Sequence, residues 1–120
     1  MNEEYMIQTA VVHWLRSRHP EILFTIAPSG MKLPISVATK FKRMGYSKGT
    51  PDMMIFEPRI KDEQHGPILR SGLFIELKTA KGRVSPEQKE WLAALEERGY
   101  ATAVCRSAPD AIVCIGSYLA

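Results

Sequence analysis

Hydrophobic positions along the chain alternate between helical and strand spacing. An apolar stripe at helical spacing predicts a helix over residues 3–18. A continuous apolar run then predicts a buried strand over residues 22–27. The next periodic segment predicts a helix over residues 35–44, with Ser36 as its N-cap. The first third of the chain therefore reads as helix, strand and helix.

The rest of the chain continues this alternation of strands and helices. Residues 58–72 contain prolines, glycines and many charges, and we expect them to form a long loop that joins two antiparallel strands. That loop is either a dimer or substrate element or an ordinary surface loop. A strand, helix and strand in succession imply a parallel crossover, so the fold class is α/β with a mixed sheet flanked by helices. The remaining elements predicted are strands over 52–57, 72–79 and 100–106, and helices over 85–98 and 107–119.

Length and composition fit one globular domain that spans residues 1–120. The chain is 45% hydrophobic and 24% charged, which argues against disorder and coiled coil. Its apolar runs are far shorter than the roughly 20 residues that cross a bilayer, so we expect no membrane segment. Glu3 and Glu4 stand where a signal peptide carries basic residues. Cys105 and Cys114 lack C-x-x-C spacing, and we expect reduced thiols in a cytoplasmic protein.

Basic residues are concentrated in one segment of the chain. The total of 16 Lys and Arg against 13 Asp and Glu gives a net charge of only +3, which does not by itself indicate nucleic acid. No acidic residue lies between positions 21 and 52, however. Such a segment either neutralises phosphates or forms a solvated helix face. Its basic residues, our candidates for DNA binding, are Lys32, Lys40, Lys42, Arg43 and Lys48.

Three residues on two predicted strands carry the candidate chemistry. Glu76 and Lys78 are two positions apart, so both side chains point to the same face of their strand. Two charges inside a sheet are costly unless they form a salt bridge or bind an ion. Antiparallel pairing brings Asp52 close to Glu76, and adjacent carboxylates repel unless a cation lies between them. Oxygen ligands with open positions suit Mg²⁺ or Mn²⁺.

The order of these motifs resembles a known nuclease family. Pro51-Asp52 and Glu76-Leu77-Lys78 match the PD-(D/E)xK nuclease signature, which is short and weak alone. A longer ordered set resembles the VRR-NUC family, the virus-type replication-repair nucleases, although Ser29 stands where Asn is expected before Gly30. That set consists of Ala27-Pro28-Ser29-Gly30, Met44-Gly45, Lys48-Gly49-Thr50-Pro51-Asp52, Glu76-Leu77-Lys78, Ser85-Pro86-Glu87-Gln88, Trp91-Leu92 and Gly99-Tyr100.

The resemblance implies a restriction-endonuclease-like core and a metal-dependent DNA endonuclease. It implies that Asp52, Glu76 and the Leu77 carbonyl hold Mg²⁺ or Mn²⁺, that Lys78 acts on the attacking water or the phosphate, and that cleavage leaves a 5′-phosphate. Stand-alone members of the family are expected to form homodimers that cut branched DNA such as four-way (Holliday) junctions. If the protein is phage-encoded, it acts in the cytoplasm of the bacterial host. The alternative is a non-catalytic DNA-binding module with the same fold.

Two further residues have both a structural and a functional interpretation. The family carries an acidic residue on its first helix, and Glu4 is the matching metal ligand and catalytic candidate. Glu3 or Glu4 equally suits the first turn of a helix, where the macrodipole favours an acid. Gln88 either completes a capping box with Ser85 or reaches the active site, as the corresponding family residue does.

Overall fold

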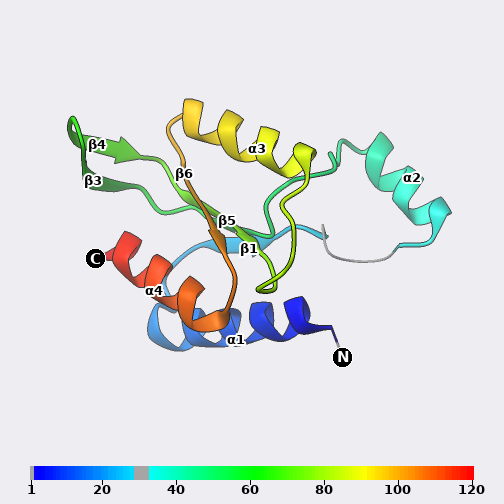
Figure 1. The fold of residues 1–120 in the computed structure, drawn as a ribbon, viewed down its shortest axis with the longest axis horizontal. Helices are drawn as coiled ribbons and strands as arrows, with labels where there is room; N and C mark the ends of the chain where they lie inside the picture. Colours follow the sequence, from blue (N-terminus) through cyan, green and yellow to red (C-terminus); the bar gives the residue numbers. More distant parts are fainter. Residues whose placement is uncertain (1, 29–32) are drawn as a thin grey trace.

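The computed structural model describes residues 2–28 and 33–120, which form four helices and six strands (Figure 1). The alternation of helices and strands predicted from the sequence is therefore present. The helices are α1 (Glu3–Arg18), α2 (Ile35–Arg43), α3 (Pro86–Glu97) and α4 (Ala108–Leu119). The strands are β1 (Phe24–Ile26), β2 (Met53–Ile55), β3 (Arg59–Glu63), β4 (Gly66–Arg70), β5 (Leu73–Leu77) and β6 (Ala101–Cys105).

The main sheet is mixed, as predicted, with the strand order β1-β2-β5-β6. β1 pairs with β2 and β2 with β5 in antiparallel register, whereas β5 and β6 are parallel. The parallel pair is joined through α3, because two parallel strands need a crossover connection. β5 is buried along its whole length and lies inside the sheet, where it presents residues to both faces.

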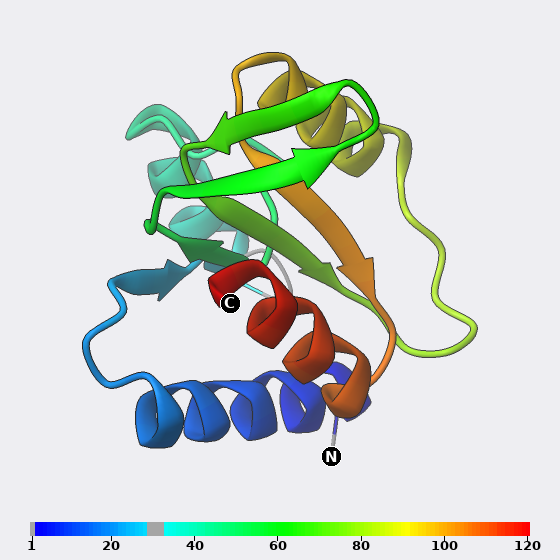
Figure 2. The same cartoon turned by 90° about the vertical axis from the view of Figure 1, so that its left-hand side faces the viewer.

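Helices cover both faces of this sheet. Figures 1 and 2 show α1 and α4 side by side on one face and α3 on the other. Ile75 and Leu77 join the core with residues of α1 and α4, including Val11 and Ile115. Phe74, on the opposite face of β5, packs against the ring of Tyr100 at 5.0 Å. Glu76 shares that second face, because side chains alternate along a strand.

The prediction of a long loop over residues 58–72 was wrong. Two strands, β3 and β4, form a separate antiparallel hairpin there, with Gly66 at its turn at a φ of +107°. The hairpin is fixed to the end of α4: Lys61 Nζ donates to the carbonyl of Ser117 at 2.8 Å, and Arg59 Nε to that of Leu119 at 3.2 Å. These cations satisfy carbonyls that the helix end leaves unpaired, which gives the strands support that composition does not reveal.

Smaller corrections concern element ends. The predicted N-cap Ser36 is wrong, because Pro34 occupies the N-cap of α2 and makes no side-chain cap bond. The first strand is also shorter than predicted, at three residues. The Ser85 capping box at the start of α3 is confirmed. No helix in the described residues is both long and apolar enough to span a bilayer.

Candidate active site

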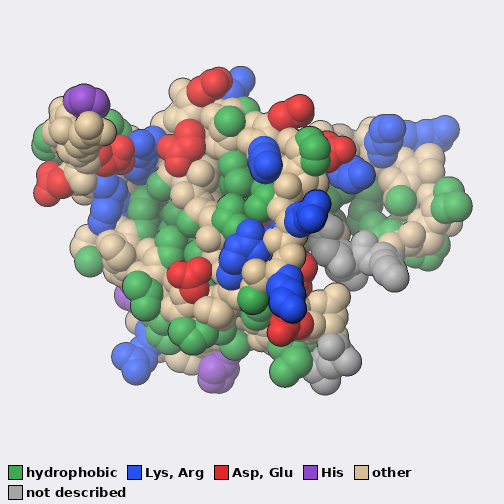
Figure 3. Space-filling view, viewed as in Figure 1, with side chains coloured by type: hydrophobic (Ala, Val, Ile, Leu, Met, Phe, Trp, Pro, Cys, Tyr) green, Lys and Arg blue, Asp and Glu red, His purple; other side chains and the backbone are tan. Residues whose placement is uncertain are grey.

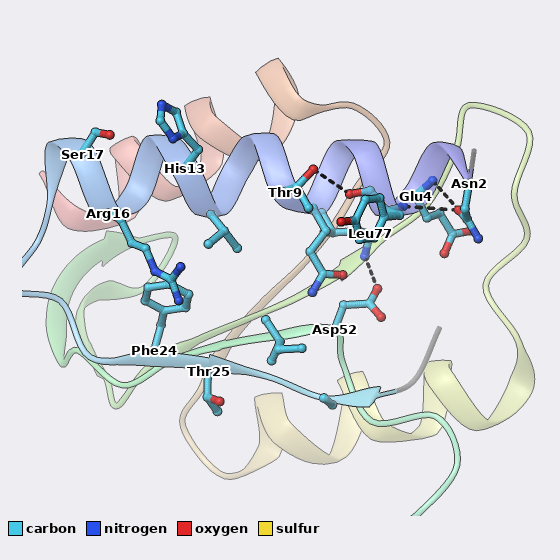
Figure 4. Close-up of a pocket in the computed structure, with 15 residues that line it drawn as sticks. Asn2, Glu4, Thr9, His13, Arg16, Ser17, Phe24, Thr25, Asp52 and Leu77 are labelled. Carbon is cyan, nitrogen blue, oxygen red and sulfur yellow. Dashed lines mark hydrogen bonds between the residues drawn. The ribbon is translucent and has the colours of Figure 1, made fainter. Parts of the chain in front are cut away.

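Asp52 lies immediately before β2 and is 5% exposed. Its Oδ2 accepts a hydrogen bond from the backbone N–H of Leu77 at 2.7 Å (Figure 4). Met53 and Ile75 are the last paired residues at this end of the β2–β5 ladder, and the Asp52 side chain continues the contact between the two strands beyond them. Asp52 is therefore held against the end of β5 by the strand that carries Glu76.

Glu76 is 2% exposed, and its carboxyl lies in a setting that opposes ionisation. Burial is the largest cause that raises its pKa, followed by the adjacent Asp52 carboxyl, and together they raise the pKa to about 9. Lys78 opposes this rise, and Glu4 adds to it. Within the described residues, the buried Glu76 Oε1 has no hydrogen-bond partner. The pair of carboxyls thus has one oxygen that nothing in the described protein satisfies.

Lys78 and Gln88 approach the other oxygen of Glu76. Lys78 Nζ lies 3.9 Å from Glu76 Oε2, and the Lys78 side chain is 12% exposed. Gln88 Nε2 donates to the same oxygen at 3.1 Å. Gln88 Oε1 accepts from the backbone N–H of Ser85 at 2.8 Å, so one amide both caps α3 and contacts Glu76. The capping and active-site interpretations of Gln88 are therefore compatible in this geometry.

Glu4 approaches from α1. It lines a cavity of about 710 Å³ that Asp52 and Leu77 also line, and Figure 4 draws all three around it. Glu3 is exposed and does not line this cavity. Within residues 2–28 and 33–120, however, no three His, Cys, Asp or Glu side chains are close enough to form a metal-binding group. Glu4 therefore shares the cavity with Asp52 but does not form a three-carboxylate metal-binding group with Asp52 and Glu76 in this structure.

The residues present fit a hard divalent cation. Adjacent buried carboxyls and an oxygen without a partner are stabilised when a positive charge lies beside them. The N–H and C=O of a strand residue point to the same side, so the Leu77 carbonyl is directed to the side on which Asp52 lies. An all-oxygen set with few protein ligands suits Mg²⁺ or Mn²⁺, which keep several waters.

The predicted DNA-binding residues of α2 lie away from this pair. α2 has no buried residue and extends from the body of the protein (Figure 1), with its cations in its last turn. Lys48 follows that helix, and its Nζ lies 4.0 Å from Glu87 on α3. Lys32 and the departure at Ser29 lie outside the described residues. The cations in the last turn of α2 are Lys40, Lys42 and Arg43.

A second basic cluster was missed by the sequence reasoning. Arg106 Nη1 donates to the carbonyls of Thr79 and Gly82, which ties the end of β6 to the loop after Lys78. Lys81 and Arg83 are exposed on the same loop. Figure 3 shows Lys and Arg side chains gathered over the connection from β5 to α3. The sequence does contain a signal for this cluster, because Lys81 and Arg83 closely follow Lys78. The nearly balanced totals of basic and acidic residues do not reveal it.

Comparisons with known proteins bear on the family and the fold. A family model described as the VRR-NUC domain matches residues 2–109. A solved structure titled "VRR_NUC domain protein" superposes with a TM-score of 0.78 and 27% sequence identity, covering 99% of this chain and 89% of that one. No protein among those with curated descriptions matches.

Proposed function

Because the chain belongs to the VRR-NUC family of nucleases, we propose that it is a metal-dependent DNA endonuclease centred on Asp52, Glu76 and Lys78. The observation that carries this proposal is the buried carboxyl pair: Glu76 Oε1 has no hydrogen-bond partner in the described residues, and Lys78 Nζ lies 3.9 Å from Glu76 Oε2. In a structural ion pair, each charged group is neutralised by its partner. Here two carboxyls face one ammonium group, so a carboxyl oxygen can still bind a cation, and that cation can bind a phosphate.

Each residue has a distinct role in this proposal. Asp52, Glu76 and the Leu77 carbonyl would hold Mg²⁺ or Mn²⁺, and Glu4, which lines the same cavity from α1, would be a further acidic ligand. The bound cation supplies a lowered water pKa and neutralises charge on the phosphate. Lys78 orients the attacking water and hydrogen-bonds the phosphate as its charge grows. The water oxygen bonds to phosphorus as the bond to the 3′ oxygen breaks, which leaves a 5′-phosphate.

Gln88 is a positioning residue in this scheme. Its Nε2 donates to Glu76 Oε2 while its Oε1 is held by the Ser85 N–H. An amide fixed at both ends has little rotamer freedom, so it keeps the Glu76 carboxylate in one orientation. Lys78 approaches the same Glu76 oxygen, and both groups therefore favour the ionised form that binds a cation.

The substrate we propose is branched DNA, including four-way junctions, cut by a homodimer. Two symmetric cuts need two active sites, and a twofold dimer supplies them. The basic residues of α2 contact the phosphate backbone, which positions DNA without reading its sequence. The loop after Lys78 carries two more exposed cations, Lys81 and Arg83, which are further candidates for phosphate contacts.

Cleavage of labelled duplex, flap, splayed-arm and four-way junction DNA, with Mg²⁺ or Mn²⁺, tests this function. We expect metal-dependent cutting that is fastest on branched substrates. Equal rates on all four would contradict the branch preference. Binding without cutting in either metal would instead support the non-catalytic DNA-binding module.

Thermal unfolding tests the metal site separately. Mn²⁺ at about 100 times its dissociation constant adds roughly 2.7 kcal/mol of stability when it binds only the folded state. We expect this shift in the wild-type protein and its loss in Asp52→Asn. Asp62→Asn is the matched control, because Asp62 is exposed on the hairpin. An equal Mn²⁺ shift in Asp52→Asn and the wild type would remove Asp52 from the site.

A further inference from the structure

The cavity beside Asp52 continues as a groove between α1 and the edge strand β1. Asp52 and Leu77 line one end, and Arg16 and Phe24 line the region toward the other end of α1 (Figure 4). The Arg16 guanidinium carbon lies 5.7 Å from the centre of the Phe24 ring. The groove thus connects the candidate catalytic carboxyls with a cation stacked on an aromatic ring.

α1 presents two different stripes to its surroundings. Val11 and Leu15 enter the hydrophobic core, whereas Gln8, Val12 and Arg16 line the groove at four-residue spacing. Polar side chains usually face bulk water on a helix of this kind. Here they line a half-open groove that also has apolar walls, a mixture typical of sites that take an amphipathic ligand.

Charge is divided along the groove. The acidic groups that line it, Glu4 and Asp52, lie at the end beside the candidate metal site. Arg16 and His13 line it farther along α1, where no acidic side chain contributes to the lining. This distribution of charge suits a ligand with several phosphates. One phosphate would lie at the acidic end, beside the candidate metal site, and the others would lie along the groove toward Arg16. Bases stack on aromatic rings and on guanidinium planes, which Phe24 and Arg16 offer together.

We propose that this groove binds a single DNA strand that continues from the phosphate held at Asp52, where the strand leaves a duplex at a branch. The proposal rests on the proposed nuclease function and adds the form of DNA that the site accepts. From Glu4 to Arg16 the helix rises about 18 Å, which spans about five stacked nucleotides of one strand. Over that length the cavity of about 710 Å³ has a mean cross-section of only about 40 Å², which accommodates the backbone of one strand and is too small for the two paired strands of a duplex.

Fluorescence anisotropy with a 12-nucleotide single strand and a blunt duplex of the same sequence tests the groove. Ca²⁺ serves as the oxygen-liganded cation during binding. We expect Arg16→Ala to weaken single-strand binding about tenfold more than duplex binding, because a stacked base and a phosphate contact are both lost. Arg18→Ala is the matched control, since Arg18 is an exposed cation of the same helix that does not line the groove.

A second variant tests the same groove by filling it. Ile26 is 44% exposed on the edge strand β1, shares the face of Phe24 and lines the groove, so Ile26→Trp narrows the channel at a position where a large residue suits a strand. We expect single-strand binding to fall in this variant as well. Equal effects of Arg16→Ala and Arg18→Ala, or unchanged binding in Ile26→Trp, would overturn the proposal. If the wild type still cleaves DNA with Mn²⁺ in that case, only the groove assignment fails and the nuclease function stands.

Discussion

The carboxyl pair and helix α2 are two charged regions of the same chain with opposite structural settings. Asp52 and Glu76 are buried, and Lys78 and Gln88 lie within 3.9 Å of Glu76 Oε2. α2 buries none of its residues, and its cations lie in an exposed last turn. The first region is organised by the sheet, whereas the second is a local helix attached to it.

The difference in burial suggests that the two regions contribute differently to the proposed nuclease activity, one to its rate and the other to its affinity for DNA. Charges fixed inside a fold lose no freedom when a substrate arrives, and they act strongly because little water screens them. Exposed cations give affinity that depends on salt and is spread over several residues. We therefore expect the buried region to set the rate of cleavage and α2 to set the affinity for DNA. The predictions below test that division.

The largest expected effect belongs to Lys78. Lys78→Met keeps most of the buried aliphatic stem but removes the ammonium group beside Glu76. We expect the single-turnover cleavage rate to fall about 100-fold to 1,000-fold, as is typical when one group that stabilises developing charge is removed. DNA affinity should change less than threefold. A rate within fivefold of wild type, in a variant that unfolds like the wild type, would remove Lys78 from the chemistry.

The opposite pattern is expected for α2. The triple variant Lys40→Ala, Lys42→Ala, Arg43→Ala removes the cations of its last turn without touching a buried residue. We expect DNA affinity at low salt to fall about tenfold or more, and the slope of log affinity against log salt to become shallower by up to about 2.7. The single-turnover rate at saturating DNA should stay near wild type. A fall in that rate with unchanged affinity would reverse the division between the two regions.

Sequence reasoning succeeded where local patterns and the topology agree. The alternation around Glu76, with its neighbours Ile75 and Leu77 in the core, follows from strand periodicity. The approach of Asp52 follows from antiparallel pairing of two strands far apart in the sequence. The Ser85 capping box depends only on neighbouring residues and was also predictable.

What the sequence did not reveal depends on contacts between distant elements. The β3–β4 hairpin is supported by carbonyls at the end of α4, which no window around residues 58–72 contains. The simultaneous contacts of Gln88 with Ser85 and Glu76 depend on the distance from α3 to β5, which no local pattern gives. The cluster of Arg106 with the loop after Lys78 joins segments 24 to 27 positions apart. Each is a tertiary arrangement rather than a local pattern.

Gln88 separates helix capping from positioning at the carboxyl pair. Glu at the third position of a helix also completes a capping box, so Gln88→Glu keeps the start of α3. It replaces the N–H that contacts Glu76 with a third carboxyl, and we expect about tenfold slower cleavage with weaker activity at low metal concentration. Gln88→Ala loses both roles. If Gln88→Glu and the wild type had equal stability and equal cleavage rates, Gln88 would act only as a cap of α3.

The two regions also differ in how pH acts on folding. Without metal, the Glu76 pKa is about 9 in the folded state and near its ordinary value of 4.5 in the unfolded chain. Between these values the folded state keeps a proton that the unfolded state releases. The free energy of unfolding therefore falls as pH rises through this window, by at most about 1.4 kcal/mol per pH unit. Urea unfolding with a chelator should show a shallower slope in Glu76→Gln, and parallel slopes would contradict this origin.

The smallest effect is expected at Lys48, which follows α2 and reaches α3. Its Nζ lies 4.0 Å from Glu87, with side-chain exposures of 83% and 45%. An exposed pair of this kind contributes at most about 1 kcal/mol, so Lys48→Ala should lower the free energy of unfolding by less than about 1 kcal/mol. Its loss should weaken DNA binding by no more than the removal of a single phosphate contact, a change of about 0.9 in the salt slope. A larger loss of cleavage rate than of affinity would place Lys48 with the buried region, because only that region is expected to act on the rate.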